Sequence, residues 1–178
     1  MRKKAFKIVG LVLLGGLAYA GWRFGPAAYD LWKGGYLFNE VEMREYQGTS
    51  KENLKALYTA MMLYHASEDA FPPADVWMDR IKPYLRTGDL SPEEALKKFR
   101  NPLIRPAGDD VYGYAMNDAF SSKHREDVED AERQPLVFDS REPVWNAHGK
   151  PEVLAPKPPR QGGNLEVTAG GDVRPMTR

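Results

Sequence analysis

The chain contains no cysteine among its 178 residues. A disulfide framework, a thiolate metal site and a cysteine nucleophile are therefore excluded. The fold has to be stable through its apolar core alone, without covalent cross-links. A chain of this length has room for one core of ordinary size, so we expect a single globular body.

An excess of positive charge is also missing, since 25 basic residues balance 25 acidic ones. Four of the basic residues precede an apolar run, which leaves the remainder with 21 basic residues and a net charge of −4. Nucleic-acid binding normally needs a basic face, so we expect no nucleic-acid partner. The mean hydropathy of −0.56 also excludes a polytopic membrane protein.

Only one long stretch lacks charge, residues 8–22, and it follows the basic start Met1-Arg2-Lys3-Lys4. This pattern predicts a membrane anchor helix over residues 1–33. The anchoring side chains would be Ile8, Val9, Leu11, Val12, Leu13, Leu14, Leu17 and Trp22. The alternative is a signal peptide cleaved after Ala20, because Ala18-Tyr19-Ala20 has small residues at the two required positions. Both interpretations place the body outside the cytoplasm, since the basic residues stay inside.

After a connector over residues 34–49, the pattern changes to helices. Ser50 is a candidate N-cap for a helix whose apolar residues recur every three or four positions as far as His65. A second helix is expected over residues 74–85. A third should begin at Ser91-Pro92 and end near Phe99, because serine suits the N-cap and proline the first helical position.

The second half of the body favours strands. We expect four of them, over residues 111–116, 135–139, 164–168 and 172–174, with Gly170-Gly171 as a hairpin turn. We expect the charged residues 123–133 to form a solvated loop or a short helix. We expect the proline-rich residues 151–160 to form an extended segment that crosses the surface. The expected fold class is α+β, with an N-terminal transmembrane helix, then a helical half packed on a small antiparallel sheet over residues 50–175, and a loose tail at 176–178.

Several short motifs occur in one order along residues 50–175. They are NLKAL at 53–57, DAFPP at 69–73, residues 77–85, FRNP at 99–102, YGYAMN at 112–117, LVFDS at 136–140 and GGNL at 162–165. In this order they resemble bacterial pseudopilin-like proteins, the relatives of type IV pilins and type II secretion pseudopilins. The resemblance implies a hydrophobic helix that carries a pilin-like head of helix and antiparallel sheet, in agreement with the periodicity.

The chain departs from this family at both ends. Family members that assemble carry a leader with glycine before Phe-Thr-Leu-Ile-Glu, whereas nothing in residues 1–22 matches it and no acidic residue precedes Asp30. Many relatives read Phe-Ala-Asp-Gly-His-Val near the C-terminus, where this chain reads Thr-Ala-Gly-Gly-Asp-Val at 168–173. These departures argue against leader processing and filament assembly.

Candidate catalytic and metal-binding residues are sparse. His65, His124 and His148 are far apart in sequence, so a packed or capping role is expected for His65 rather than a zinc site. Asp139-Ser140 follows a strand, where either an active-site residue or a turn is found. Calcium remains an alternative for the acidic residues of the body, although no Asp-x-Asp-x-Asp-Gly loop is present. These acidic residues are Asp109, Asp110, Asp118, Glu126, Asp127, Glu129 and Asp130.

Ten aromatic residues either supply the core or line a groove, and the sequence leaves both open. They are Tyr58, Tyr64, Phe71, Trp77, Tyr84, Phe99, Tyr112, Tyr114, Phe138 and Trp145.

The resemblance implies a non-enzymatic interaction or structural protein, anchored by one helix in the cytoplasmic membrane. Its partners would be other membrane or secretion-apparatus proteins, and no cofactor is expected. One alternative is a secreted ligand-binding domain released after Ala20. The other is a membrane-anchored hydrolase that uses Asp139.

Overall fold

The computed structural model describes residues 22–26, 29, 45–85, 87–104 and 110–177. The chain divides into two compact units, Met1–Glu42 and Met43–Arg178. In the first unit, residues 22–26 are helical and the side chain of Trp22 is exposed. The other predicted anchor residues lie outside the described residues. Within the described part, no helix has both the length and the apolar character needed to cross a membrane.

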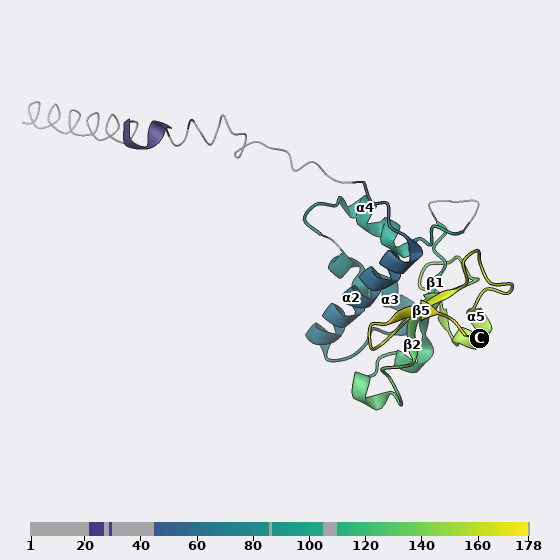
Figure 1. Cartoon of the computed structure of the whole chain (residues 1–178). Helices are drawn as coiled ribbons and strands as arrows, with labels where there is room; N and C mark the ends of the chain where they lie inside the picture. The colour runs from purple at the N-terminus through teal and green to yellow at the C-terminus, as the bar shows by residue number, and fades with distance from the viewer. Residues whose placement is uncertain (1–21, 27–28, 30–44, 86, 105–109, 178) are drawn as a thin grey trace, which may run out of the picture. The chain divides into compact units, whose positions relative to one another are not determined.

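The second unit has the predicted α+β class (Figure 1). Its α-helices are α2 (Ser50–Glu68), α3 (Trp77–Ile81), α4 (Pro92–Leu96) and α5 (Pro151–Leu154). Its 3-10 helices are η1 (Ala74–Val76), η2 (Lys82–Leu85), η3 (Lys97–Phe99), η4 (Asp118–Phe120) and η5 (Arg125–Asp127). Its strands are β1 (Tyr114–Asn117), β2 (Pro135–Asp139), β3 (His148–Gly149), β4 (Leu165–Thr168) and β5 (Val173–Pro175).

The strands form one sheet in the order β3-β1-β2-β4-β5. The predicted hairpin is confirmed, because β4 and β5 pair antiparallel around Gly170-Gly171. The prediction of a purely antiparallel sheet is wrong at one edge, where β3 pairs parallel to β1. Only two residues of β3 take part, and the backbone N–H of Met116 donates to the carbonyl of Ala147 at 3.0 Å. A strand of two residues is too short to show the alternating pattern from which strands are predicted.

The N-cap of helix α2 lies one residue earlier than predicted. Thr49, not Ser50, is the N-cap, and it forms a capping box with Glu52. The Thr49 hydroxyl accepts from the backbone N–H of Glu52 at 3.3 Å, and the Glu52 carboxylate accepts from the N–H of Thr49 at 2.7 Å. These bonds satisfy two helix-end donors, which leaves the side chain of Ser50 to point into the body.

The second predicted helix is shorter than expected. Residues 74–85 divide into η1, α3 and η2, and Pro83 lies in η2. Proline lacks the N–H that an α-helix needs in its interior, which accounts for the tighter turn after α3. The third predicted helix is confirmed in detail, since the Ser91 hydroxyl caps α4 by accepting from the N–H of Glu94 at 3.2 Å.

Apolar residues are buried on both faces of the sheet. The larger core lies between the sheet and the helices, where α2 buries Leu54, Leu57, Ala60 and Met61 completely. Leu136 and Val137 both join this core, because a register shift in β2 interrupts the alternation of the strand. Figure 1 shows α2 lying alongside the strands.

The smaller core covers the opposite face of the sheet and contains Ala115, Phe138, Ala147 and Leu154. The prediction that residues 151–160 form an exposed extended crossing is therefore wrong for residues 151–156, whereas residues 157–159 are exposed and outside any helix. Pro151 instead starts the short helix α5, which proline favours at its first position. Leu154 and Ala155 are buried by it, and they close this face of the sheet.

Candidate functional site

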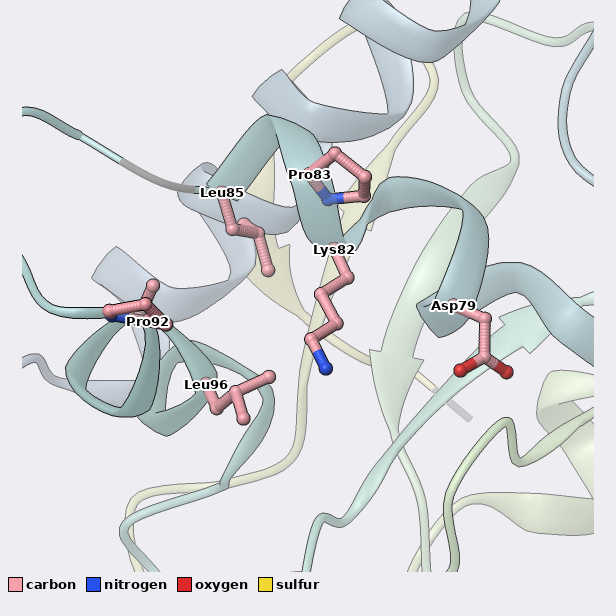
Figure 2. A pocket seen from close by; sticks show the side chains of 7 residues that line it. Asp79, Lys82, Pro83, Leu85, Pro92 and Leu96 are labelled. Carbon is pink, nitrogen blue, oxygen red and sulfur yellow. The ribbon is translucent and has the colours of Figure 1, made fainter.

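A groove lies between η2 and α4 on the surface of the body (Figure 2). Its first part has a volume of about 360 Å³ and is lined by Asp79, Lys82, Pro83, Leu85, Pro92, Ala95 and Leu96. A second part of about 250 Å³ shares three of these residues, Asp79, Lys82 and Leu96. It adds Arg100, Tyr112 and Trp145. We refer to the two parts together as the η2/α4 groove.

Local sequence explains why apolar side chains line the first part. The tight turn of η2 brings Pro83 and Leu85 to the wall, and the capped start of α4 brings Pro92 and Leu96 to the opposite side. Lys98 fixes the distance between these segments, because its ammonium donates to the carbonyl of Leu85 at 2.7 Å while its side chain is almost completely buried.

The second part is built on a long-range contact between α3 and the segment before β3. The Asp79 carboxylate accepts hydrogen bonds from Trp145 Nε1 at 3.0 Å and from Asn146 Nδ2 at 2.7 Å. The Trp145 ring packs edge-on against Tyr112 and against Phe99, with a centroid distance of 4.9 Å in both pairs. Both oxygens of Asp79 are thus engaged in holding the wall of the groove.

The rim of the groove carries the positive charge of Lys82. The side chain of Lys82 is exposed, and no residue in the described part of the chain accepts a hydrogen bond from it or pairs with it. Figure 2 shows its amine projecting between Leu96 and Asp79. Arg100 lines the same part of the groove. An apolar floor with a cation beside it suits a ligand that is both apolar and anionic.

Asp139, the residue considered for catalysis, lies elsewhere and is fully buried. Its Oδ1 accepts from Asn101 Nδ2 at 2.8 Å and lies 3.5 Å from the hydroxyl of Ser50. Its Oδ2 accepts from the backbone N–H of Leu165 at 2.8 Å. Arg160 Nη1 stands 3.9 Å from Oδ1. The carboxylate therefore joins the start of α2, the turn after η3, the end of β2 and the start of β4.

Burial raises the pKa of Asp139 to about 6, against the lowering effect of the Leu165 N–H, Arg160 and the two side-chain donors. A raised pKa of this kind is common at catalytic sites. A hollow of about 450 Å³ lies nearby, and Ser50 and Leu165 are on its wall. Asp139 itself does not line the hollow, and it is completely buried. The arrangement gives Asp139 a role in joining segments.

Ser140 is equally enclosed. Its side chain is buried, its hydroxyl accepts from the backbone N–H of Glu142 at 3.0 Å, and its carbonyl accepts from Arg160. These bonds are those of a strand end that turns into a loop, which is the structural alternative that the sequence offered.

The structure brings two of the three histidines together. His65 and His124 line a polar hollow of about 370 Å³ with Asp69 and residues 125–127. His65 Nε2 accepts from the backbone N–H of Arg125 at 3.3 Å, so the histidine joins α2 to η5, and its ring packs on Phe71. The sequence missed this proximity because 59 positions separate the two histidines.

His148 stands apart from this hollow and contacts Asp118 at 2.7 Å. In the described residues, which leave out Asp109, no group of three or more His, Asp or Glu side chains is placed to hold a metal ion. The candidate acidic residues for calcium are therefore not gathered there.

The sequence leaves open whether the aromatic residues supply the core or line a groove, and the structure shows examples of both. Phe71, Trp77, Phe99, Tyr114 and Phe138 are buried in the two cores, whereas Tyr112 and Trp145 line the groove. The sequence also missed Asp79, Lys82 and Leu96 as groove residues. The helical patterns of residues 74–85 and 91–99 identify these residues as parts of two helices but do not predict that the two helices lie side by side.

The resemblance of residues 50–175 to pseudopilin-like proteins stays a prediction from motifs. Comparison of the chain with protein-family models, with curated proteins and with solved structures finds no match in any of the three.

Proposed function

We propose that the chain is a non-enzymatic interaction protein, anchored in the cytoplasmic membrane by one helix and carrying its α+β body outside the cytoplasm, as in type II secretion pseudopilins. The observation that carries this proposal is the η2/α4 groove. It offers a protein partner an apolar floor and the ammonium group of Lys82, which has no partner among the described residues. By contrast, the Asp139 carboxylate is buried and enclosed by the chain's own donors.

The anchor is supported by the order of charges along the N-terminus. Four basic residues precede an uncharged run of 15 residues, and the run ends at Trp22. Basic residues remain on the cytoplasmic side of a membrane helix, so the segments that follow are exported. The proposed partners are accordingly proteins of the membrane or of an export apparatus.

Membrane extraction and intact mass of the native protein test the anchor. The proposal expects an uncut chain that leaves the membrane only in detergent. Replacing Leu13 by Arg places a charge in the middle of the run, at a cost to insertion of about 3 kcal/mol, and should release the body from the membrane. A matched change outside the run, Lys51→Arg, should leave the protein in the membrane.

A native chain that starts at Gly21 and is soluble without detergent would contradict the anchor and favour the secreted ligand-binding domain. Replacing both Ala18 and Ala20 by Leu removes the small residues that signal peptidase needs. If the native chain is cleaved, this double variant should be retained in the membrane. If the native chain is uncut, the variant should behave like the parent.

A further inference from the structure

We propose that the η2/α4 groove binds a segment of a partner protein in which one bulky apolar side chain stands next to a carboxylate. This inference rests on the proposed function, because it specifies the chemistry of the partner that an interaction protein would take. The apolar side chain enters the part lined by Pro83, Leu85 and Leu96, and the carboxylate meets the ammonium group of Lys82.

The apolar part has the character of an anchor pocket. Five of its seven lining residues are proline, leucine or alanine, and Leu85 is almost completely buried beneath it. The bond from Lys98 to the Leu85 carbonyl and the cap at Ser91 position its walls. A largely apolar pocket gains most from one large side chain that displaces its water.

Charge complementarity selects the neighbouring group of the partner. Lys82 has no acceptor among the described residues, and Asp79 already accepts from Trp145 and Asn146. A carboxylate near Lys82 gains a new ion pair and leaves the bonds of Asp79 intact. A basic group would face both Lys82 and Arg100, and a neutral amide would gain a weaker bond.

The test uses fluorine NMR on the full chain in detergent, with 5-fluorotryptophan in place of its four tryptophans. Trp145 lines the groove, and the Trp145→Phe variant identifies its signal. The probes are three short, capped peptides that differ only at their centre, which reads Leu-Glu, Leu-Gln or Ala-Glu. Titration of each peptide against the Trp145 signal gives its dissociation constant.

The expected result is that the Leu-Glu peptide shifts the Trp145 signal and binds about threefold to fivefold more tightly than the Leu-Gln peptide, as befits one solvent-accessible ion pair. This preference should fall as salt is added. The Lys82→Gln variant should bind the two peptides equally. The control Lys123→Gln, at an exposed lysine that does not line the groove, should keep the preference. The Ala-Glu peptide should bind more weakly than either.

Equal binding of the Leu-Glu and Leu-Gln peptides by the parent chain would overturn the inference, as would a preference that survives in Lys82→Gln. A Trp145 signal that moves with protein concentration alone would assign the groove to a second copy of the chain. A Trp145 signal that moves with anionic lipid vesicles but with none of the peptides would assign it to a lipid headgroup. Both assignments also overturn the inference.

Failure of the inference is distinguishable from failure of the proposed function. A chain that stays in the membrane but shows no peptide preference loses only the proposed partner chemistry. A chain that is cleaved and soluble loses the anchor, whatever its peptide binding.

Discussion

Asn101 donates a hydrogen bond from its side-chain nitrogen to Oδ1 of Asp139 over 2.8 Å, although 38 positions separate the two residues. Asp139 is completely buried and Asn101 nearly so. A second bond, from Asn53 Nδ2 to the carbonyl of Arg100 at 2.8 Å, ties the same turn to α2. The buried carboxylate is thus one point, beside the larger apolar core, at which the helical half and the sheet of the body are joined.

The first prediction concerns the pH dependence of stability. Burial raises the pKa of Asp139 from 3.8 to about 6, so the folded chain disfavours the ionised form. Between these two values the folded chain binds more protons than the unfolded chain, and the free energy of unfolding falls as the pH rises. We expect a loss of about 1 kcal/mol between pH 5 and pH 7, measured by urea unfolding at a series of pH values.

The comparison of variants isolates this contribution from those of other groups. Asp139→Asn removes the ionisation and should flatten the slope, whereas Asp75→Asn, at an exposed position, should keep it. The lowered pKa values of Glu52 and Glu94 act in the opposite sense, since their stabilisation is lost only as the pH falls below the usual range of glutamate. An identical slope in Asp139→Asn and the parent would show that Asp139 is not the group responsible.

The second prediction is an energetic coupling between Asn101 and Asp139. Asn101→Ala removes a donor to a buried carboxylate, and we expect a loss of about 2 kcal/mol of unfolding free energy at pH 7. In the Asp139→Asn background the same change should cost about 1 kcal/mol less, because no buried charge is left without its donor. Urea unfolding of the four chains of this double-mutant cycle measures the coupling. Additive losses would contradict a direct interaction.

The sequence predicted the elements whose signals are local. Ser91 and Pro92 meet the cap and first-turn preferences of α4 within adjacent positions, and the Gly170-Gly171 turn stands directly between its two strands. The preference for serine at N-caps predicts Ser50 as the cap of α2, although the sequence also contains the signal that distinguishes Thr49. Glu52 stands three positions after Thr49, which is the spacing of a capping box.

The groove and the burial of the Asp139 carboxylate could not be predicted from the sequence, because they depend on contacts between distant segments. Asp79 and Trp145 come from segments 66 positions apart, and each is an ordinary residue in its local context. Nothing in either segment predicts that the indole N–H of Trp145 donates to the carboxylate of Asp79. Likewise, an aspartate at the position of Asp139 is typical of a turn. It becomes a buried acceptor only because the fold places the Asn101 side chain and the backbone N–H of Leu165 against it.

The third prediction tests the capping box. Thr49→Ala removes the hydroxyl that accepts from the N–H of Glu52, and we expect a loss of about 1 kcal/mol of unfolding free energy. Thr59 provides a matched control on the same helix, because it is exposed and, among the described residues, its hydroxyl bonds only to the carbonyl of Lys55. Thr59→Ala should leave the stability unchanged or slightly raised, since alanine is the better helix former. Equal losses in the two variants, measured by thermal unfolding, would contradict a capping role for Thr49.

The fourth prediction separates the wall of the groove from its charge. Asp79→Ala removes the acceptor of both Trp145 and Asn146, and we expect a loss of about 1 to 2 kcal/mol of unfolding free energy. Because the Trp145 ring is then held only by its packing on Tyr112 and Phe99, its fluorine signal should shift even without peptide. Affinity for the Leu-Glu and Leu-Gln peptides should fall together.

Lys82→Gln is the contrasting variant for this prediction. It should leave the stability and the free Trp145 signal as they are in the parent, because the Lys82 side chain forms no bond with any other described residue. It should change only the preference between the two peptides. Asp79 therefore shapes the groove through Trp145, and Lys82 selects what enters it. If Asp79→Ala left the free Trp145 signal unmoved, the carboxylate would not be what positions the indole, and the wall would depend on ring packing alone.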